Sequence, residues 1–161
     1  MKLAEALIER KAAKDKIARL RERITQNAKV QEGDTPHEDP RELLRELDAA
    51  QQELRALTVR INATNIQTAL ADDARATLME AIADRDALAL KRAALQQVVG
   101  AAAVTREHGF AITRSEIKFR ATVDVAAMQK EIDALAKEYR ELDARIQARN
   151  FETELIEWRE V

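Results

Sequence analysis

Apolar residues recur along this chain at spacings of three and four positions, in four stretches separated by polar segments. The stretches cover about residues 3–30, 40–64, 78–102 and 124–150. Spacings of three and four place side chains on one face of an α-helix. The pattern therefore predicts four long amphipathic helices and an all-α fold.

Capping residues mark where these helices begin. Asp39 precedes Pro40, and Glu42 follows three positions after Asp39, so the second helix is expected to start with a capping box and a proline in its first turn. Asp124 occupies the same place before the fourth helix. Both helix starts are thus predicted from local chemistry.

Asparagines suggest where the same two helices end. Asn65 and Asn150 would take the left-handed conformation that commonly follows a helix. The next residue, Ile66 or Phe151, would then pack back onto the last turn. We expect both helices to end near these asparagines.

The sequence contains an internal repeat. Residues 46–70 read ELDAAQQELRALTVRINATNIQTAL and residues 131–155 read EIDALAKEYRELDARIQARNFETEL, with twelve of 25 positions identical. Residues 3–24 match residues 78–99 at eight of 22 positions. Self-similarity of this kind indicates a duplicated structural unit.

The repeat predicts how the helices are arranged. One all-helical domain, residues 1–161, would contain two similar helical hairpins in residues 1–70 and 76–155. The hairpins would form an antiparallel four-helix bundle or long coiled-coil-like hairpins, related by an approximate two-fold axis.

The second copy has ten extra residues between its helices, because the offset between copies rises from 75 to 85 positions. The segment VTREHGFAITRSEIKFRATV, residues 104–123, alternates apolar and polar positions and is expected to form a short β-hairpin or extended arm. It has a local charge of +2 between residues 106 and 120. One interpretation is that the arm covers the end of the bundle or pairs with the arm of another subunit. The alternative is that it binds a polyanion or nucleic acid. The residues that would make this contact are Arg106, Arg114, Ser115, Lys118, Phe119 and Arg120.

Two arginines occupy equivalent positions among the apolar residues of the first and third helices. Arg10 and Arg85 need carboxylate partners if they are buried, and the duplicated Asp48 and Asp133 are candidates. Such pairs would set the register of the helices. A polar pocket that binds a ligand is the alternative.

Composition favours a non-enzymatic protein without a cofactor. The chain has no cysteine, which excludes a disulfide or a thiolate metal site, and it lacks a Gly-rich phosphate loop and any Glu-x-x-His pair. The pairs Glu138/Glu141 and Glu154/Glu157 are spaced like the magnesium ligands of all-α nucleotide pyrophosphohydrolases, but acid-rich helices often show this spacing. His37 and His108 lie in the two loops between helices, and no metal site is predicted.

Partners and location follow from the distribution of apolar and charged residues. No apolar run approaches the length of a membrane span, and the net charge is only −2, so we expect a cytoplasmic protein without a membrane partner. Apolar residues outside the main seams indicate a homo-oligomer. They are Leu7, Ile8, Leu44, Val59, Leu90 and Ile156.

Three segments resemble one group of small bacterial proteins. ALIERK, RSEIKFRATVDV and EYRELDARIQARNFETELIE together resemble biochemically uncharacterised proteins of this length that are often called septicolysin. The name implies a cytolysin, but the chain has none of the amphipathic Gly/Ser-rich strands that a pore former would insert. The resemblance therefore implies a family of unknown function.

Overall fold

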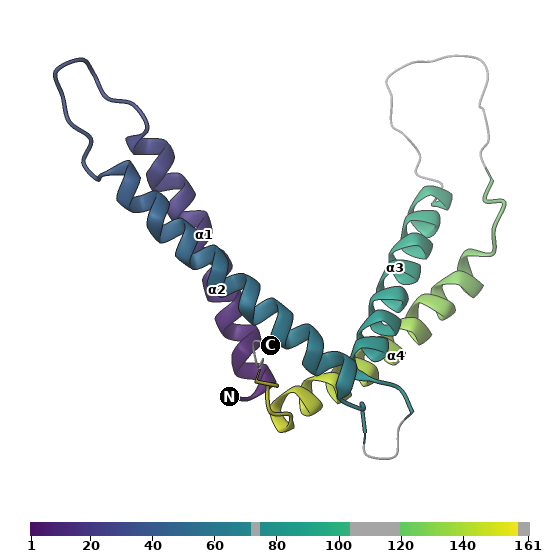
Figure 1. The fold of residues 1–161 in the computed structure, drawn as a ribbon. Coiled ribbons are helices and arrows are strands. Elements are labelled where there is room, and N and C mark those ends of the chain that lie inside the picture. Colours follow the sequence, from purple (N-terminus) through teal and green to yellow (C-terminus); the bar gives the residue numbers. More distant parts are fainter. Residues whose placement is uncertain (72–74, 104–119, 158–161) are drawn as a thin grey trace, which may run out of the picture. The chain divides into compact units, whose positions relative to one another are not determined.

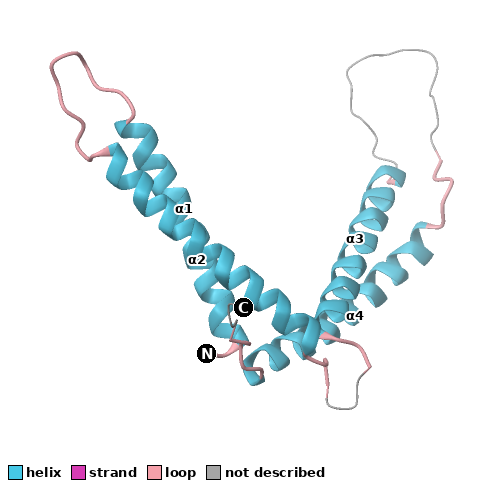
Figure 2. Ribbon diagram, in the orientation of Figure 1, coloured by secondary structure: helices cyan, strands magenta, loops and turns pink. Residues whose placement is uncertain are grey.

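A computed structural model describes residues 1–71, 75–103 and 120–157 of the chain. These residues form α1 (Leu3–Asn27), α2 (Pro40–Gln67), α3 (Leu78–Ala102) and α4 (Val125–Glu152), and Figures 1 and 2 show helices joined by loops with no sheet among them. The predicted all-α fold is confirmed. The predicted arm lies largely in residues 104–119, outside the described part.

The helices pair into two hairpins, α1 with α2 and α3 with α4. Within the first hairpin, Leu20, Leu43 and Ala50 form a buried cluster. The residues packed against this cluster are partly buried, as expected where only two helices meet. They are Ile17, Ile24 and Leu47.

The chain divides into two compact units, each described here by itself. The first contains Met1–Met79 and Ile146–Val161, and the second contains Glu80–Arg145. The first unit thus includes the α1/α2 hairpin together with the first residues of α3 and the last turns of α4. The second unit holds the remainder of the α3/α4 hairpin.

The predicted starts of α2 and α4 are confirmed, but the capping box expected at α2 is not formed, since the N–H of Glu42 donates to the carbonyl of Asp39. The Asp39 carboxylate accepts a hydrogen bond from the backbone N–H of Arg41 at 2.8 Å, and Pro40 is the first residue of α2. The Asp124 carboxylate accepts from the N–H of Ala127 at 2.9 Å. Both caps satisfy backbone donors that have no partner within the helix.

The predicted helix ends are wrong. Helix α2 continues past Asn65 to Gln67 and α4 continues past Asn150 to Glu152. No residue other than glycine has a positive φ in the described part of the chain, so neither asparagine is left-handed. Ile66 and Phe151 are 53% and 67% exposed instead of packing back onto their helices.

The chain leaves α2 in an extended conformation because the next residues pair with the start of α3. Thr68 has φ −94° and ψ 122°. The N–H of Leu70 donates to the carbonyl of Ala76 at 2.9 Å, and the N–H of Leu78 donates to the carbonyl of Thr68 at 2.8 Å. These two bonds form a short antiparallel bridge, which we call the connector bridge.

The same bridge occurs between the start of α1 and the segment after α4. The N–H of Leu155 donates to the carbonyl of Met1, and the N–H of Leu3 donates to that of Thr153, both at 2.9 Å. Each residue is the repeat equivalent of one in the connector bridge. We call this pairing the terminal bridge.

Burial follows the repeat as well. Near the two bridges, equivalent residues of the two copies are buried to nearly the same extent, so the duplicated sequence packs alike there. The pairs are Leu3 and Leu78, Ile61 and Ile146, and Leu70 and Leu155.

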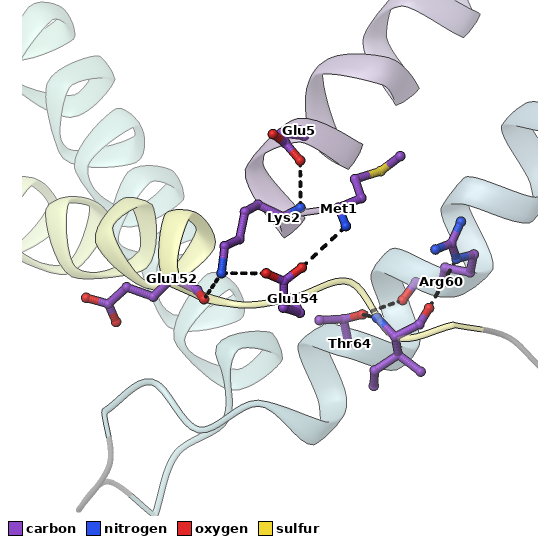
Figure 3. A network of polar contacts seen from close by, with 8 residues as sticks. Met1, Lys2, Glu5, Arg60, Thr64, Glu152 and Glu154 are labelled. Carbon is purple, nitrogen blue, oxygen red and sulfur yellow. Dashed lines mark hydrogen bonds and ion pairs between the residues drawn. The ribbon is translucent and has the colours of Figure 1, made fainter.

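Polar side chains surround the terminal bridge (Figure 3). The Lys2 ammonium lies 2.7 Å from the Glu154 carboxylate and donates to the carbonyl of Glu152 at 2.9 Å. The hydrogen bond from Lys2, together with that from the Met1 amino group, lowers the pKa of Glu154 below its ordinary value. The Glu5 carboxylate accepts from the Lys2 N–H at 2.7 Å and so caps α1.

A buried threonine joins α2 to the segment after α4. Thr64 is fully buried, donates to the carbonyl of Arg60 at 2.8 Å and accepts from the N–H of Ile156 at 3.1 Å. The Arg60 guanidinium returns a bond to the carbonyl of Ile156 at 3.1 Å. Residues 92 and 96 positions apart are therefore held by paired hydrogen bonds.

Candidate interaction surface on helix α3

Helix α3 exposes apolar side chains on the side opposite its seam with α4. Leu90 is 74% exposed and Val98 is 39% exposed. Four exposed alanines lie on the same side, because all six positions are spaced by three or four residues. We call this surface the α3 outer face, and it consists of Ala83, Ala87, Leu90, Ala94, Val98 and Ala101.

The α3 outer face differs in charge from the equivalent surface of α1. Where α3 has Leu90, Ala94 and Val98, helix α1 has Asp15, Arg19 and Arg23 at the equivalent positions. Residues 93–102 of α3 include no charged residue at all. The two equivalent helices therefore differ in charge at these three positions.

The seam between α3 and α4 combines buried apolar side chains, among them Ile132 and Leu135, with polar contacts. The Arg92 guanidinium lies 5.5 Å from the centre of the Tyr139 ring, a cation–π contact. The equivalent residue of Arg92 in α1 is Ile17, which packs on the apolar cluster of the first hairpin. Lys91 forms an ion pair with Glu131 of α4 at 2.6 Å.

Arg85 adds a second ionic contact to this seam. Its Nη1 lies 3.0 Å from Asp143 of α4, and its Nη2 lies 2.8 Å from Asp86. Burial lowers the pKa of Arg85, but the hydrogen bonds to Asp86 and Asp143 outweigh burial and the pKa is raised. The guanidinium therefore stays charged and bridges the two helices.

The structure places the predicted ion-pair residues differently from the sequence interpretation. Arg85 pairs with Asp143, whereas Asp133 is exposed and accepts a hydrogen bond from Gln129 on its own helix. Arg10 is half-buried and Asp48 is exposed, and within the described residues no ion pair joins them. The repeat did not suggest Asp143, because its equivalent in the first hairpin is Thr58.

Most of the predicted basic arm lies outside the described residues. This applies to Arg106, Arg114, Ser115, Lys118 and Phe119, whereas Arg120 is described and exposed. Its role in binding an anion or nucleic acid stays a prediction.

The described residues contain neither a cluster of metal ligands nor a membrane-spanning helix. No group of three or more His, Asp or Glu side chains is placed there to hold a metal ion. Glu138 and Glu141 are exposed on α4, whereas Glu154 lies beyond the helix and pairs with Lys2. None of the described helices has both the length and the apolar character needed to cross a bilayer.

Comparison with known proteins agrees with one part of the resemblance, namely that the chain belongs to a family of unknown function. A family described as a family of unknown function (DUF6847) matches residues 10–155. The chain belongs to this family. No curated protein matches the chain.

A solved structure extends the comparison to the fold. The crystal structure of a functionally unknown conserved protein from Corynebacterium diphtheriae is 40% identical in sequence and superimposes with a TM-score of 0.86. The match covers 97% of this chain and 99% of that one. Neither description mentions septicolysin or lysis, so the comparisons support membership in an uncharacterised family and give that name no support.

Proposed function

We propose that this chain is a non-enzymatic helical interaction protein that assembles with copies of itself. The observation that carries the proposal is the α3 outer face, where Leu90 and Val98 are exposed at positions that are charged in α1. Removing a leucine side chain from water stabilises a complex by about 1.5–3 kcal/mol. An exposed face of this kind is typical of a surface that another protein covers.

The seam of the second hairpin supports the same interpretation. Arg92 stands where α1 has Ile17, so α3 presents one aliphatic side chain fewer to its seam than α1 does. Association of a second chain with the outer face would bury Leu90 and Val98 as well.

Measurement of the mass in solution tests the proposal. The full chain, examined by light scattering or native mass spectrometry over a range of micromolar concentrations, is expected to be a dimer or larger. A strict monomer at high micromolar concentration would overturn the proposal.

A second candidate function is binding of a polyanion or nucleic acid by the basic arm. It is supported by the +2 charge between residues 106 and 120, in the one loop where the repeat is interrupted. Binding should weaken steeply with salt and be lost when Arg114, Lys118 and Arg120 become alanine. Replacement of Lys11, Lys14 and Lys16, three exposed lysines of α1, controls for the loss of charge. No gel shift at low salt would count against this function.

The proposed compartment is the cytoplasm. Fractionation of cells that produce the full chain, with markers for each compartment, tests this placement, and recovery in another fraction would contradict it.

A further inference from the structure

Building on the proposed self-assembly, we propose that the α3 outer face binds the same face of a second copy in antiparallel orientation. Leu90 of each copy packs against Ala87 of the other. The two helices are then related by a two-fold axis, which closes the assembly as a dimer. The face spans about 27 Å from Ala83 to Ala101, at 1.5 Å per residue.

The spacing of large and small residues supports antiparallel pairing. Ala83 and Ala94 lie equally far from the midpoint between Ala87 and Leu90. When two copies pair about this midpoint, Leu90 meets Ala87 and Ala83 meets Ala94. In a parallel pair Leu90 would meet Leu90 and Ala87 would meet Ala87, which leaves gaps at the alanines that close packing does not tolerate.

The charges beside the face are complementary in the antiparallel arrangement. Asp84 and Lys91 follow Ala83 and Leu90 directly and flank the same edge of the face. Antiparallel pairing brings Asp84 of one copy near Lys91 of the other, and the symmetry repeats this contact. Lys91 is 59% exposed even though it pairs with Glu131, so its ammonium has N–H groups that can donate to a second carboxylate.

An exposed isoleucine on α1 offers a matched control for Leu90. Ile8 is 68% exposed, similar to Leu90, but lies on a helix whose outer face is charged at Asp15, Arg19 and Arg23. Sedimentation equilibrium of the full chain should show that Leu90→Glu weakens association at least about tenfold, which is about 1.4 kcal/mol. Ile8→Glu should change association less than about twofold.

Cysteine cross-linking tests the register directly, because the natural chain has no cysteine. An equal mixture of the Ala83→Cys and Ala94→Cys variants should form a disulfide-linked heterodimer rapidly. Ala83→Cys mixed with Ala101→Cys should react much more slowly, because the paired positions would be about 10 Å apart along the helices.

The outcomes separate this inference from the proposed function. Association of the natural chain that Leu90→Glu leaves intact would overturn the α3 interface but not self-assembly, whereas a monomeric natural chain would overturn both. If Leu90→Glu fails to fold by circular dichroism, the cross-linking decides. A fast disulfide in Ala83→Cys alone would indicate parallel pairing and contradict the antiparallel register.

Discussion

Thr64 shows how one side chain connects distant parts of the sequence. Its hydroxyl uses both capacities, donating to Arg60 within α2 and accepting from Ile156 after α4. The sequence marked Asn65 as the informative residue of this turn. The neighbouring threonine is buried instead, because it faces the segment that returns after α4.

Replacement of Thr64 by valine should destabilise the fold by about 1–2 kcal/mol, because the N–H of Ile156 loses its partner. Thr58→Val is the matched control, since the hydroxyl of Thr58 donates to the carbonyl of Leu54 in its own helix at 2.7 Å and bonds to no other described residue. It should change stability by less than about 0.5 kcal/mol. Urea denaturation measures the free energy of unfolding of both variants. Equal losses of stability would contradict the role of the hydrogen bond from Ile156.

Glu38 is a second residue whose contact bears on stability. Its carboxylate forms an ion pair with Arg23 near the end of α1, with Nε to Oε2 at 3.0 Å, and its N–H donates to Asn27 at 3.1 Å. The hydrogen bond from Arg23 lowers the pKa of Glu38 below its ordinary value of 4.5. A lowered pKa in the folded state means that the ionised form stabilises the fold.

The contribution of Glu38 should therefore depend on pH. It is fully present above pH 4.5, the ordinary value, and is lost as the pH falls through the lower pKa of the folded state. The stability difference between the natural chain and Glu38→Gln should be constant near neutral pH and should shrink below pH 4.5. Urea denaturation across this range measures it, with Glu53→Gln as the control for a lost charge. A difference that persists in acid would contradict the pairing.

At the scale of elements, the two hairpins have similar lengths but different seams. Helices α1 and α3 have 25 residues each, and α2 and α4 have 28 each. The first hairpin has an apolar cluster around Leu20 and Leu43, whereas the second adds contacts of Arg85 and Arg92 to the buried Ile132 and Leu135. Equal helix lengths thus do not imply equal packing.

A double-mutant cycle measures what the Arg85–Asp143 contact contributes to the second hairpin. Arg85→Met, Asp143→Asn and the double variant should give a coupling energy of about 1 kcal/mol, because both side chains are only partly exposed. Asp86→Asn should cost less, since the Asp86 carboxylate is 60% exposed. Coupling near zero would show that the contact does not stabilise the hairpin.

At the scale of the whole chain, the connector bridge and the terminal bridge are equivalent. Five residues, 71–75, separate Leu70 from Ala76 in the connector, and six residues, 156–161, follow Leu155. Joining Val161 to Met1 would therefore create a second connector only one residue longer. The covalent connector thus joins α2 to α3 in the same way as the non-covalent terminal bridge joins the segment after α4 to α1.

A circular permutant should consequently fold. With Val161 joined to Met1 and the chain opened between Asp72 and Asp73, we expect the helix content of the natural chain and stability within about 2 kcal/mol of it. A permutant opened between Gln51 and Gln52, inside α2, is the control and should be much less stable. Circular dichroism and urea denaturation compare them. Loss of cooperative unfolding in the first permutant would contradict the equivalence of the bridges.

The sequence by itself determined the four helices, the starts of α2 and α4 and the pairing into duplicated hairpins. These features depend on local periodicity, on capping by Asp39 and Asp124 and on comparison of the two copies. Tertiary structure decided where α2 and α4 end, because the two bridges draw Thr68 and Thr153 into extended segments.

Tertiary structure also decided which residues contact one another across the helices. It selected Asp143 as the partner of Arg85, a residue that has no acidic counterpart in the other copy. Helix α3 carries apolar residues on two sides, and periodicity alone does not distinguish the side that meets α4 from the side that stays exposed. Only the packed hairpin leaves Leu90 and Val98 at the surface.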